Sequence, residues 1–264
     1  MVGQKELKIQ FEHFDLATLP RTLIFLGDIG SGRKTFAYWL IHKLKMPSVL
    51  VGNSADDIRG LTQVKVADPT AYIISDVDQL SIAAQNSLLK TLEETPENMY
   101  FMLTATQEDL VIPTILSRCF TYRMCNYSRQ ELLDYLDQNY TYKDKELDVI
   151  LDICTCPGDI NLLLEYDIGE FMDYVRKVHK NIAIVSGANS FKIGDKINLA
   201  DDSKKFDLGL FWRAFMSLCM KELDVKNLLA VQITSEYYAD LRIKGINKQI
   251  AFDNWILAIR KAWM

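Results

Sequence analysis

The sequence predicts an α/β fold in which a parallel sheet covered by helices is followed by an all-helical region. Two observations lead to this prediction. In the first half of the chain, short apolar runs of strand length alternate with helical stretches that have a polar face, which is the pattern of βαβ units. From residue 128 onward, the apolar residues instead recur at helical spacing. The expected strands are residues 22–26, 48–52, 71–75, 100–105 and 120–124.

The composition is that of a globular protein with a large core. The chain has 264 residues, of which 49% are hydrophobic and 25% charged, so we expect two or three domains. A net charge of −5 lacks the basic footprint of a free-standing nucleic-acid binder, so any DNA contact must be local or shared with partners. The N-terminus lacks a basic and apolar leader, and no apolar run approaches the ~20 residues that span a bilayer. We therefore expect a cytoplasmic protein.

The first predicted strand leads into a glycine-rich loop and then a helix, the arrangement in which backbone N–H groups cradle phosphates. The loop glycines are Gly27, Gly30 and Gly32. A working loop continues with lysine and then threonine or serine, whereas this chain has Arg33 and Lys34. Arg33 keeps the charge, but its planar fork is a poor substitute for a compact ammonium group. Lys34 removes the hydroxyl that holds magnesium and places a cation there, a repulsion of about 8 kcal/mol at ~4 Å for an effective dielectric near 20.

An alternative register of this loop remains open at this point. A slip by one residue would let Lys34 and Thr35 act as the lysine and threonine of the pattern, in a loop that is one residue longer. Magnesium-dependent binding of ATP would distinguish the slipped register from the degenerate one.

The middle of the chain predicts two further strands around a helix. The strand at 71–75 delivers Asp76 at its carboxyl end, the edge at which open α/β sheets bind ligands. Leu88 and Leu92 belong to the apolar stripe of the helix that follows, and Pro96 ends it. Two interpretations of the polar face with Gln85, Asn86 and Lys90 are open: contact with duplex DNA, or a solvated surface. Asp78 is interpreted as a helix-start charge favoured by the helix dipole.

Two segments of this region resemble a known family, the AAA+ clamp-loader subunits of bacterial DNA polymerase III. The segments are NSLLKTLEETP at residues 86–96 and PTILSRC at residues 113–119, and weaker family segments lie at residues 2–4 and 54–59. The resemblance implies an AAA+ P-loop domain with a three-layer parallel-sheet core, then a small helical lid and an all-α collar domain for oligomerisation. The expected boundaries are 1–125, 126–166 and 167–264.

The resemblance also implies roles for the residues at the strand ends. Ser75 and Asp76 align with the Asp-Glu pair of the family's ATPases, whose first member steers magnesium and whose second polarises water. Serine cannot be the anionic magnesium partner, although Asp76 could still orient a water. Thr106 matches the sensor position after the fourth strand. In the lid, Asn161 stands where the family has an ATP-sensing arginine, so we expect a degenerate nucleotide site without hydrolysis in cis.

Arg118, in the Ser117-Arg118-Cys119 triplet, is by resemblance the arginine that a subunit inserts into its neighbour's ATP site. Such a group stabilises transition-state charge and can supply roughly 10³ to 10⁵ in rate. The alternative is a surface arginine at a strand edge. Ser117 is expected to shape the turn and Cys119 to be a small buried filler.

The resemblance thus predicts a stator subunit similar to delta-prime within a DNA-directed DNA polymerase holoenzyme. It would use ATP and magnesium only at the neighbouring subunit's site. Its expected partners are gamma/tau-like and delta-like subunits, the sliding clamp, and primer–template DNA through the assembly, with no membrane. Two rivals remain, a gamma-like ATPase using the slipped loop and a solitary AAA+ adaptor or helicase loader. Magnesium-dependent ATP binding would favour the first, and failure to associate with clamp-loader subunits the second.

The remaining sequence features concern thiols and helix faces. Five cysteines without disulfide-framework spacing indicate free thiols, and with only three histidines in the chain we expect no metal site at Cys154 and Cys156. Residues 186–202 lack helical spacing and are expected to form a loop. One further helix has an apolar face that either fills the core or packs against sister subunits, the two being compatible. This face consists of Leu208, Phe211, Trp212, Phe215, Leu218 and Cys219.

Overall fold

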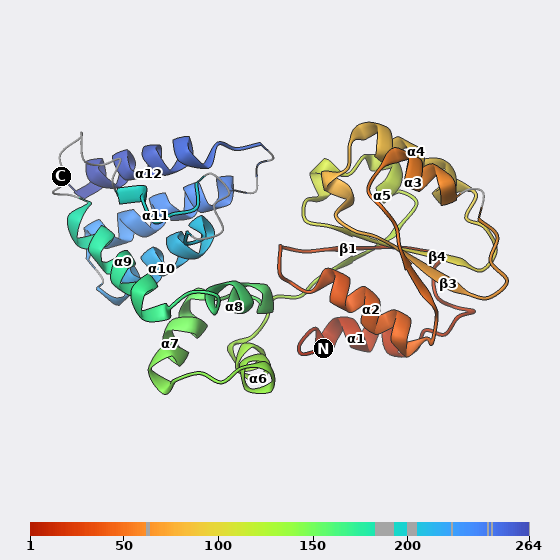
Figure 1. The fold of residues 1–264 in the computed structure, drawn as a ribbon, viewed down its shortest axis with the longest axis horizontal. Coiled ribbons are helices and arrows are strands. Elements are labelled where there is room, and N and C mark those ends of the chain that lie inside the picture. The colour runs from red at the N-terminus through yellow and green to blue at the C-terminus, as the bar shows by residue number, and fades with distance from the viewer. Residues whose placement is uncertain are drawn as a thin grey trace. The chain divides into compact units, whose positions relative to one another are not determined.

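The fold is described from a computed structural model (Figure 1), which covers residues 1–61, 64–182, 193–199, 205–222, 224–241, 243 and 245–263. The loop expected at 186–202 lies largely outside these described residues. The chain divides into two compact units. The first comprises Met1–Tyr135 with Cys156–Gly158, and the second Leu136–Thr155 with Asp159–Met264. The division into a P-loop domain, a lid and a collar stays a prediction.

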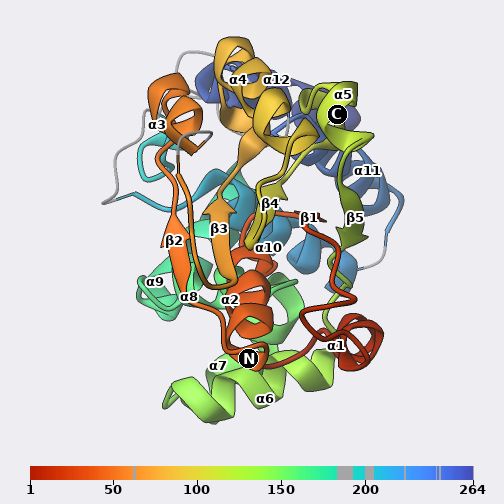
Figure 2. The ribbon, with the colours of Figure 1, turned by 90° about the vertical axis from the view of Figure 1, so that its right-hand side faces the viewer.

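The first unit contains a five-stranded parallel sheet with the strand order β2-β3-β4-β1-β5, whose strands lie side by side in Figure 2. Each expected strand is confirmed to within two residues at either end. β1, β3 and β4 are buried along their whole length, as expected for a parallel sheet with both faces covered. The strands are β1 (Thr22–Leu26), β2 (Ser48–Leu50), β3 (Thr70–Ile74), β4 (Met99–Ala105) and β5 (Phe120–Arg123).

Helices cover both faces of the sheet (Figure 1). One face packs on α1 (Lys5–Glu12) and α2 (Arg33–Lys43) through a core rich in phenylalanine. The opposite face packs on α3 (Ala55–Gly60), α4 (Ile82–Glu93) and α5 (Pro113–Leu116). Alternate residues of each strand point to opposite faces, so neighbouring strand residues serve the two cores in turn. In β1, for example, Ile24 belongs to the second core and Phe25 to the first.

The topology determines where a ligand site would lie. β1 sits between β4 and β5, so the direction in which the chain adds strands reverses beside it. In open α/β sheets, ligands bind at the carboxyl ends of the strands at such a point. The glycine-rich loop follows β1, while the ends of β3 and β4 carry Asp76 and Thr106. The sheet therefore brings the predicted nucleotide residues to one edge.

The second unit is helical, in agreement with the periodicity of the sequence. Its core is aromatic: Phe211, Trp212 and Phe215 pack with Phe252 and Trp255, and the Trp255 indole donates to the Thr234 hydroxyl at 2.9 Å. The helices after the sheet are α6 (Arg129–Asn139), α7 (Asp144–Ile153), α8 (Pro157–Leu163), α9 (Ile168–Asn181), α10 (Leu208–Lys221), α11 (Val225–Asp240) and α12 (Lys248–Trp263). α6 and α8 each cross the boundary between the two units.

The predicted apolar face of α10 belongs to the core of this chain. Five of its six residues are at most 1% exposed, and Leu218 is half-buried. Its aromatic side chains contact α12 of the same chain, and packing against sister subunits through this face stays a prediction. The helices of the described part of the chain include none long and apolar enough to cross a membrane.

Candidate functional site

The glycine-rich loop has the backbone of a phosphate loop. Gly30 and Gly32 have φ angles of +81° and +87°, in the left-handed region that residues with a Cβ seldom occupy. Gly32 is the N-cap of α2 and therefore provides no side chain to cap the first N–H groups of the helix. Free N–H groups at a helix N-terminus form a ready site for an anion. In geometry, the loop remains suited to a phosphate.

The charged groups of the loop, however, are paired within the chain. Arg33 is 9% exposed, and its Nη2 lies 3.1 Å from Oδ1 of Asp76. The residue predicted to replace the phosphate-binding lysine thus bonds the residue predicted to polarise water. Nη1 of Arg33 is buried and has no hydrogen-bond partner among the described residues. A magnesium nucleotide would have to break this ion pair before either side chain could serve it.

Lys34 and Thr35 lie on the exposed side of the first turn of α2. Arg33, by contrast, is turned into the protein toward Asp76. The structure therefore places Arg33, and neither Lys34 nor Thr35, at the edge of the sheet where the other predicted nucleotide residues meet.

The strand ends place three more predicted residues close together. Asp76 has a φ of +51°, and its backbone N–H donates to the Thr104 hydroxyl at 2.9 Å. The Ser75 hydroxyl is buried and has no partner among the described residues. Thr106, the predicted sensor residue, donates its hydroxyl to the carboxylate of Asp78. Thr106 is therefore engaged with a buried acid of its own chain.

Asp78 lies at the start of a short 3₁₀ helix rather than of α4, and its side chain is buried. Asp78 is 1% exposed within a single 3₁₀ turn, Val77–Gln79, and also accepts the backbone N–H of Gln107 at 3.2 Å. The sequence suggested a helix start because an acidic residue there is favoured by the dipole. Burial follows from the packing of this turn beneath the end of β4, where the Thr106 hydroxyl, the Gln107 N–H and the Gln79 side-chain amide donate to the carboxylate.

Residues distant in the sequence cover the outer side of the loop. The Tyr127 hydroxyl donates to the carbonyl oxygen of Ser31 at 3.0 Å, and Gly158 N–H donates to that of Gly30 at 3.1 Å. A Cβ on Gly158 would lie 2.3 Å from Cα of Gly30, so the two glycines permit a close approach of backbones. The loop is thus held from outside by its own chain.

Arg118 lies in the turn between α5 and β5 and is anchored on three sides. Its Nη1 donates to the Thr114 carbonyl oxygen at 2.9 Å and lies 3.4 Å from the Ser117 hydroxyl. Its Nη2 lies 2.6 Å from Oε1 of Glu93, and the Arg118 side chain is 33% exposed. The Arg118 carbonyl oxygen accepts the Thr22 hydroxyl at 2.5 Å, which ties the turn to β1. Burial raises the pKa of the Cys119 thiol to about 12, so this neighbour stays protonated.

Gln85 is a positioning residue that the sequence analysis missed. Its side chain donates to the Leu110 carbonyl oxygen at 3.1 Å and accepts the Ile112 N–H at 2.9 Å. Because Gln85 is 1% exposed, it belongs neither to a DNA-contacting face nor to a solvated one. The sequence did offer a signal, because Gln85 lies three and seven residues before Leu88 and Leu92, on the side of the helix that carries the apolar stripe. Gln85 fixes the start of α5, the helix that leads to Arg118.

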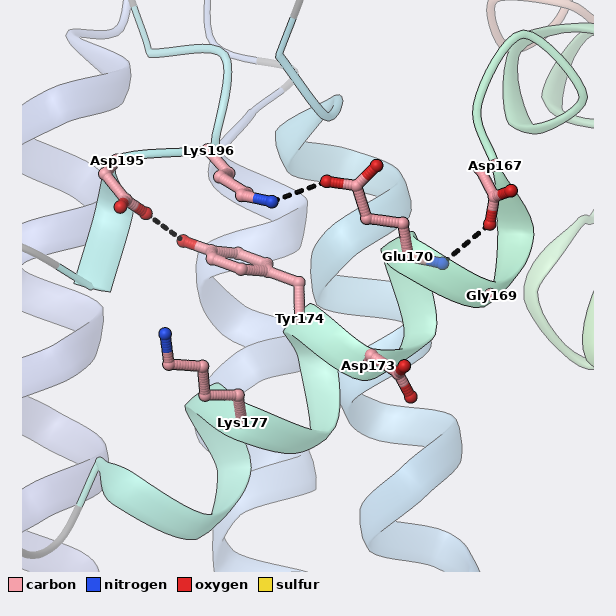
Figure 3. Close-up of a pocket in the computed structure, with 8 residues that line it drawn as sticks. All are labelled: Asp167, Gly169, Glu170, Asp173, Tyr174, Lys177, Asp195 and Lys196. Atoms are coloured by element: carbon pink, nitrogen blue, oxygen red, sulfur yellow. Dashed lines mark hydrogen bonds and ion pairs between the residues drawn. The ribbon is translucent and has the colours of Figure 1, made fainter.

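A cavity of about 610 Å³ lies beside α9 in the second unit (Figure 3). Two pairs of lining side chains bond each other: Lys196 pairs with Glu170 at 2.5 Å, and Tyr174 donates to Asp195 at 3.3 Å. None of the residues predicted to bind nucleotide lines it. Across the described ranges, no cluster of three or more histidine, cysteine or acidic side chains could hold a metal ion.

Comparison of the sequence with known proteins identifies relatives of this chain. Residues 54–128 match the family model described as DNA polymerase III, delta subunit. The chain is 36% identical over 91 residues, or 33% of its length, to DNA polymerase III subunit tau of Bacillus subtilis. The chain is homologous to DNA polymerase III subunits. The predicted resemblance to the delta-prime-like clamp-loader subunits is thereby confirmed.

Two further comparisons extend over more of the chain. DNA polymerase III subunit gamma/tau of Mycoplasma genitalium is 24% identical over 241 residues, which is 78% of this chain. The chain spans only 16% of the Bacillus relative and 38% of the Mycoplasma relative. A gamma subunit-related protein of DNA polymerase III from Thermotoga maritima has a similar fold, with a TM-score of 0.51 at 17% identity, over 98% of this chain and 99% of that one.

Proposed function

We propose that this chain is a delta-prime-like subunit of a DNA polymerase III clamp loader that does not hydrolyse ATP itself. In this proposal it supplies Arg118 to the ATP site of a neighbouring gamma/tau-like subunit. A delta-like subunit completes the ring, which opens the sliding clamp and places it on primer–template DNA.

The observation that carries the proposal is the ion pair between Arg33 and Asp76. In a working site, the loop cation neutralises phosphate and the acid at the strand end acts on water and magnesium. Here each neutralises the other at 3.1 Å. Ser75 is uncharged and Asp76 is paired with Arg33. The negative charge that could attract a magnesium ion is therefore smaller than in a working site. The exposed positions of Lys34 and Thr35 support the register in which Arg33 replaces the lysine.

The surroundings of Arg118 support a role outside this chain. Its guanidinium is partly exposed at the end of the sheet next to the edge strand β5. The turn that carries it is fixed by Thr22 and by the α5 helix, so its backbone is positioned before any partner binds. A guanidinium on a pre-positioned backbone is suited to stabilising charge that develops on a phosphate. The three-domain arrangement, with a collar that binds sister subunits, belongs to the same proposal.

The test is the variant Arg118→Ala in a ring reconstituted with the gamma/tau-type and delta-type subunits of the same organism. We expect clamp- and DNA-stimulated ATP turnover to fall at least ~10²-fold, because the transition-state charge loses its donor. The matched control is Arg123→Ala, since Arg123 is an exposed arginine five residues away that pairs with Glu108. Turnover that is equal in the two variants would contradict the proposal.

A further inference from the structure

The two signature segments of this chain are joined by an ion pair. Glu93 is the last residue of α4, and Arg118 lies in the turn after α5. Their charged atoms, Oε1 and Nη2, are 2.6 Å apart. The side chains are 49% and 33% exposed, so solvent reaches both. The pair can therefore open without unpacking the core.

The contacts of Arg118 direct its guanidinium back toward its own chain. Nη2 bonds Glu93, while Nη1 bonds the Thr114 carbonyl oxygen at 2.9 Å. An arginine that binds a phosphate in the bidentate manner presents two N–H groups side by side. In the present orientation both terminal nitrogens already bond groups of α4 and α5. Contact with a neighbour's nucleotide requires the guanidinium to leave Glu93.

We propose that Glu93 is the positioning residue of Arg118, holding the guanidinium retracted until the phosphates of a neighbouring subunit's nucleotide replace the carboxylate. This inference rests on the proposed function, in which Arg118 acts in trans. The carboxylate has a single negative charge, whereas the terminal phosphates of ATP have more, so the nucleotide is the stronger partner. Exposed ion pairs are weak, and releasing one changes an equilibrium by about fivefold at most.

Competition between Glu93 and the nucleotide phosphates for Arg118 affects the binding of ATP more than the rate of the chemical step. Once Arg118 contacts the phosphates, Glu93 is no longer its partner and has no part in the transition state. Removing the charge of Glu93 should therefore make ATP easier to engage and leave the maximal rate unchanged. A purely structural role for Glu93 predicts a different result, namely a lower maximal rate through a misplaced Arg118.

The experiment compares Glu93→Gln with the matched control Glu94→Gln in the reconstituted ring. Glu94 is the next residue, is exposed, and forms no ion pair with any residue that the structure describes. Both variants remove one negative charge from the same surface. For Glu93→Gln we expect the ATP concentration at half-maximal turnover to fall about two- to fivefold with kcat unchanged, and for Glu94→Gln no change.

A double variant tests whether the effect of Glu93→Gln depends on its contact with Arg118. The effect of Glu93→Gln on ATP half-saturation should vanish in the Arg118→Ala background, because the residue that Glu93 holds is then absent. Equal behaviour of the two glutamine variants, or a lower kcat for Glu93→Gln, would overturn the inference. Failure of Arg118→Ala to lower turnover would instead overturn the proposed function, so the two results are distinguishable.

Discussion

At the scale of single residues, a buried ion pair joins Asp159 and Arg213 in the helical part of the chain. Asp159 lies in the stretch where the resemblance placed an ATP-sensing arginine, and its Oδ1 is 2.6 Å from Nη2 of Arg213. The two side chains are 14% and 11% exposed, and Thr155 also bonds the pair. Burial alone would raise the pKa of Asp159. The hydrogen bonds and charge of Arg213 outweigh that effect and leave this pKa below its ordinary value.

We expect Asp159→Asn to lower the free energy of unfolding by about 3–5 kcal/mol at pH 7, because it leaves a buried guanidinium without its counter-charge. Urea denaturation measures this difference. The carboxyl pKa is lower in the folded state, so its contribution is complete above the unfolded pKa of about 4 and is lost as pH falls through the folded pKa. The gap between wild type and variant should therefore narrow in acid. A gap that is independent of pH would contradict this account.

At the scale of elements, α4 organises the segment that leads to Arg118. Gln85, near its start, holds the chain at Leu110 and Ile112, where α5 begins. Glu93, at its end, holds the guanidinium itself. The apolar stripe between these two residues, Leu88 and Leu92, is buried against the sheet. One helix thus positions the Ser-Arg-Cys turn through both of its ends.

We expect Gln85→Met to lower the free energy of unfolding by about 2 kcal/mol, since a buried N–H and a carbonyl oxygen lose their partner. Hydrogen exchange at the amides of residues 112 and 114–118 should become faster. Asn86→Met is the matched control, because Asn86 is the exposed neighbour on the same helix. Unchanged exchange at these amides in Gln85→Met would show that the α5 segment is held by other contacts.

At the scale of the whole molecule, exposed apolar side chains gather on α11 of the helical unit. Val225, Leu228 and Leu229, the α11 face, are 74%, 51% and 42% exposed. Their spacing of three and four residues places them on one side of the helix. The aromatic core of α10 is already filled, so this different surface is the one we expect to contact sister subunits in the proposed collar.

We expect Leu228→Glu to weaken association with the gamma/tau-type and delta-type subunits at least tenfold, as burying a charge replaces the burial of a leucine side chain. Analytical ultracentrifugation of the mixed subunits measures this. Ile9→Glu is the matched control, since Ile9 is 57% exposed on α1 of the other unit. Equal association of both variants would exclude the α11 face from the interface.

The sequence by itself determined the sheet, the loop and the change from strands to helices. Central strands of a parallel sheet are buried on both faces, so their apolar runs are continuous and their ends fall where polar residues begin. The loop glycines were visible for a similar local reason, because their spacing reflects backbone conformation. The departures from the nucleotide-site pattern at Arg33, Lys34 and Ser75 could also be recognised from the sequence.

Only the tertiary structure decided how the charged and polar side chains are used. Arg33 meets Asp76, Arg118 meets Glu93, and Asp159 meets Arg213, each across a separation that sequence periodicity does not encode. Asp78 and Gln85 are buried although residues of these types usually face solvent. A polar side chain can be buried only where the folded backbone provides its partners. Those partners come together when the sheet and its helices pack, and this is why the sequence could not reveal them.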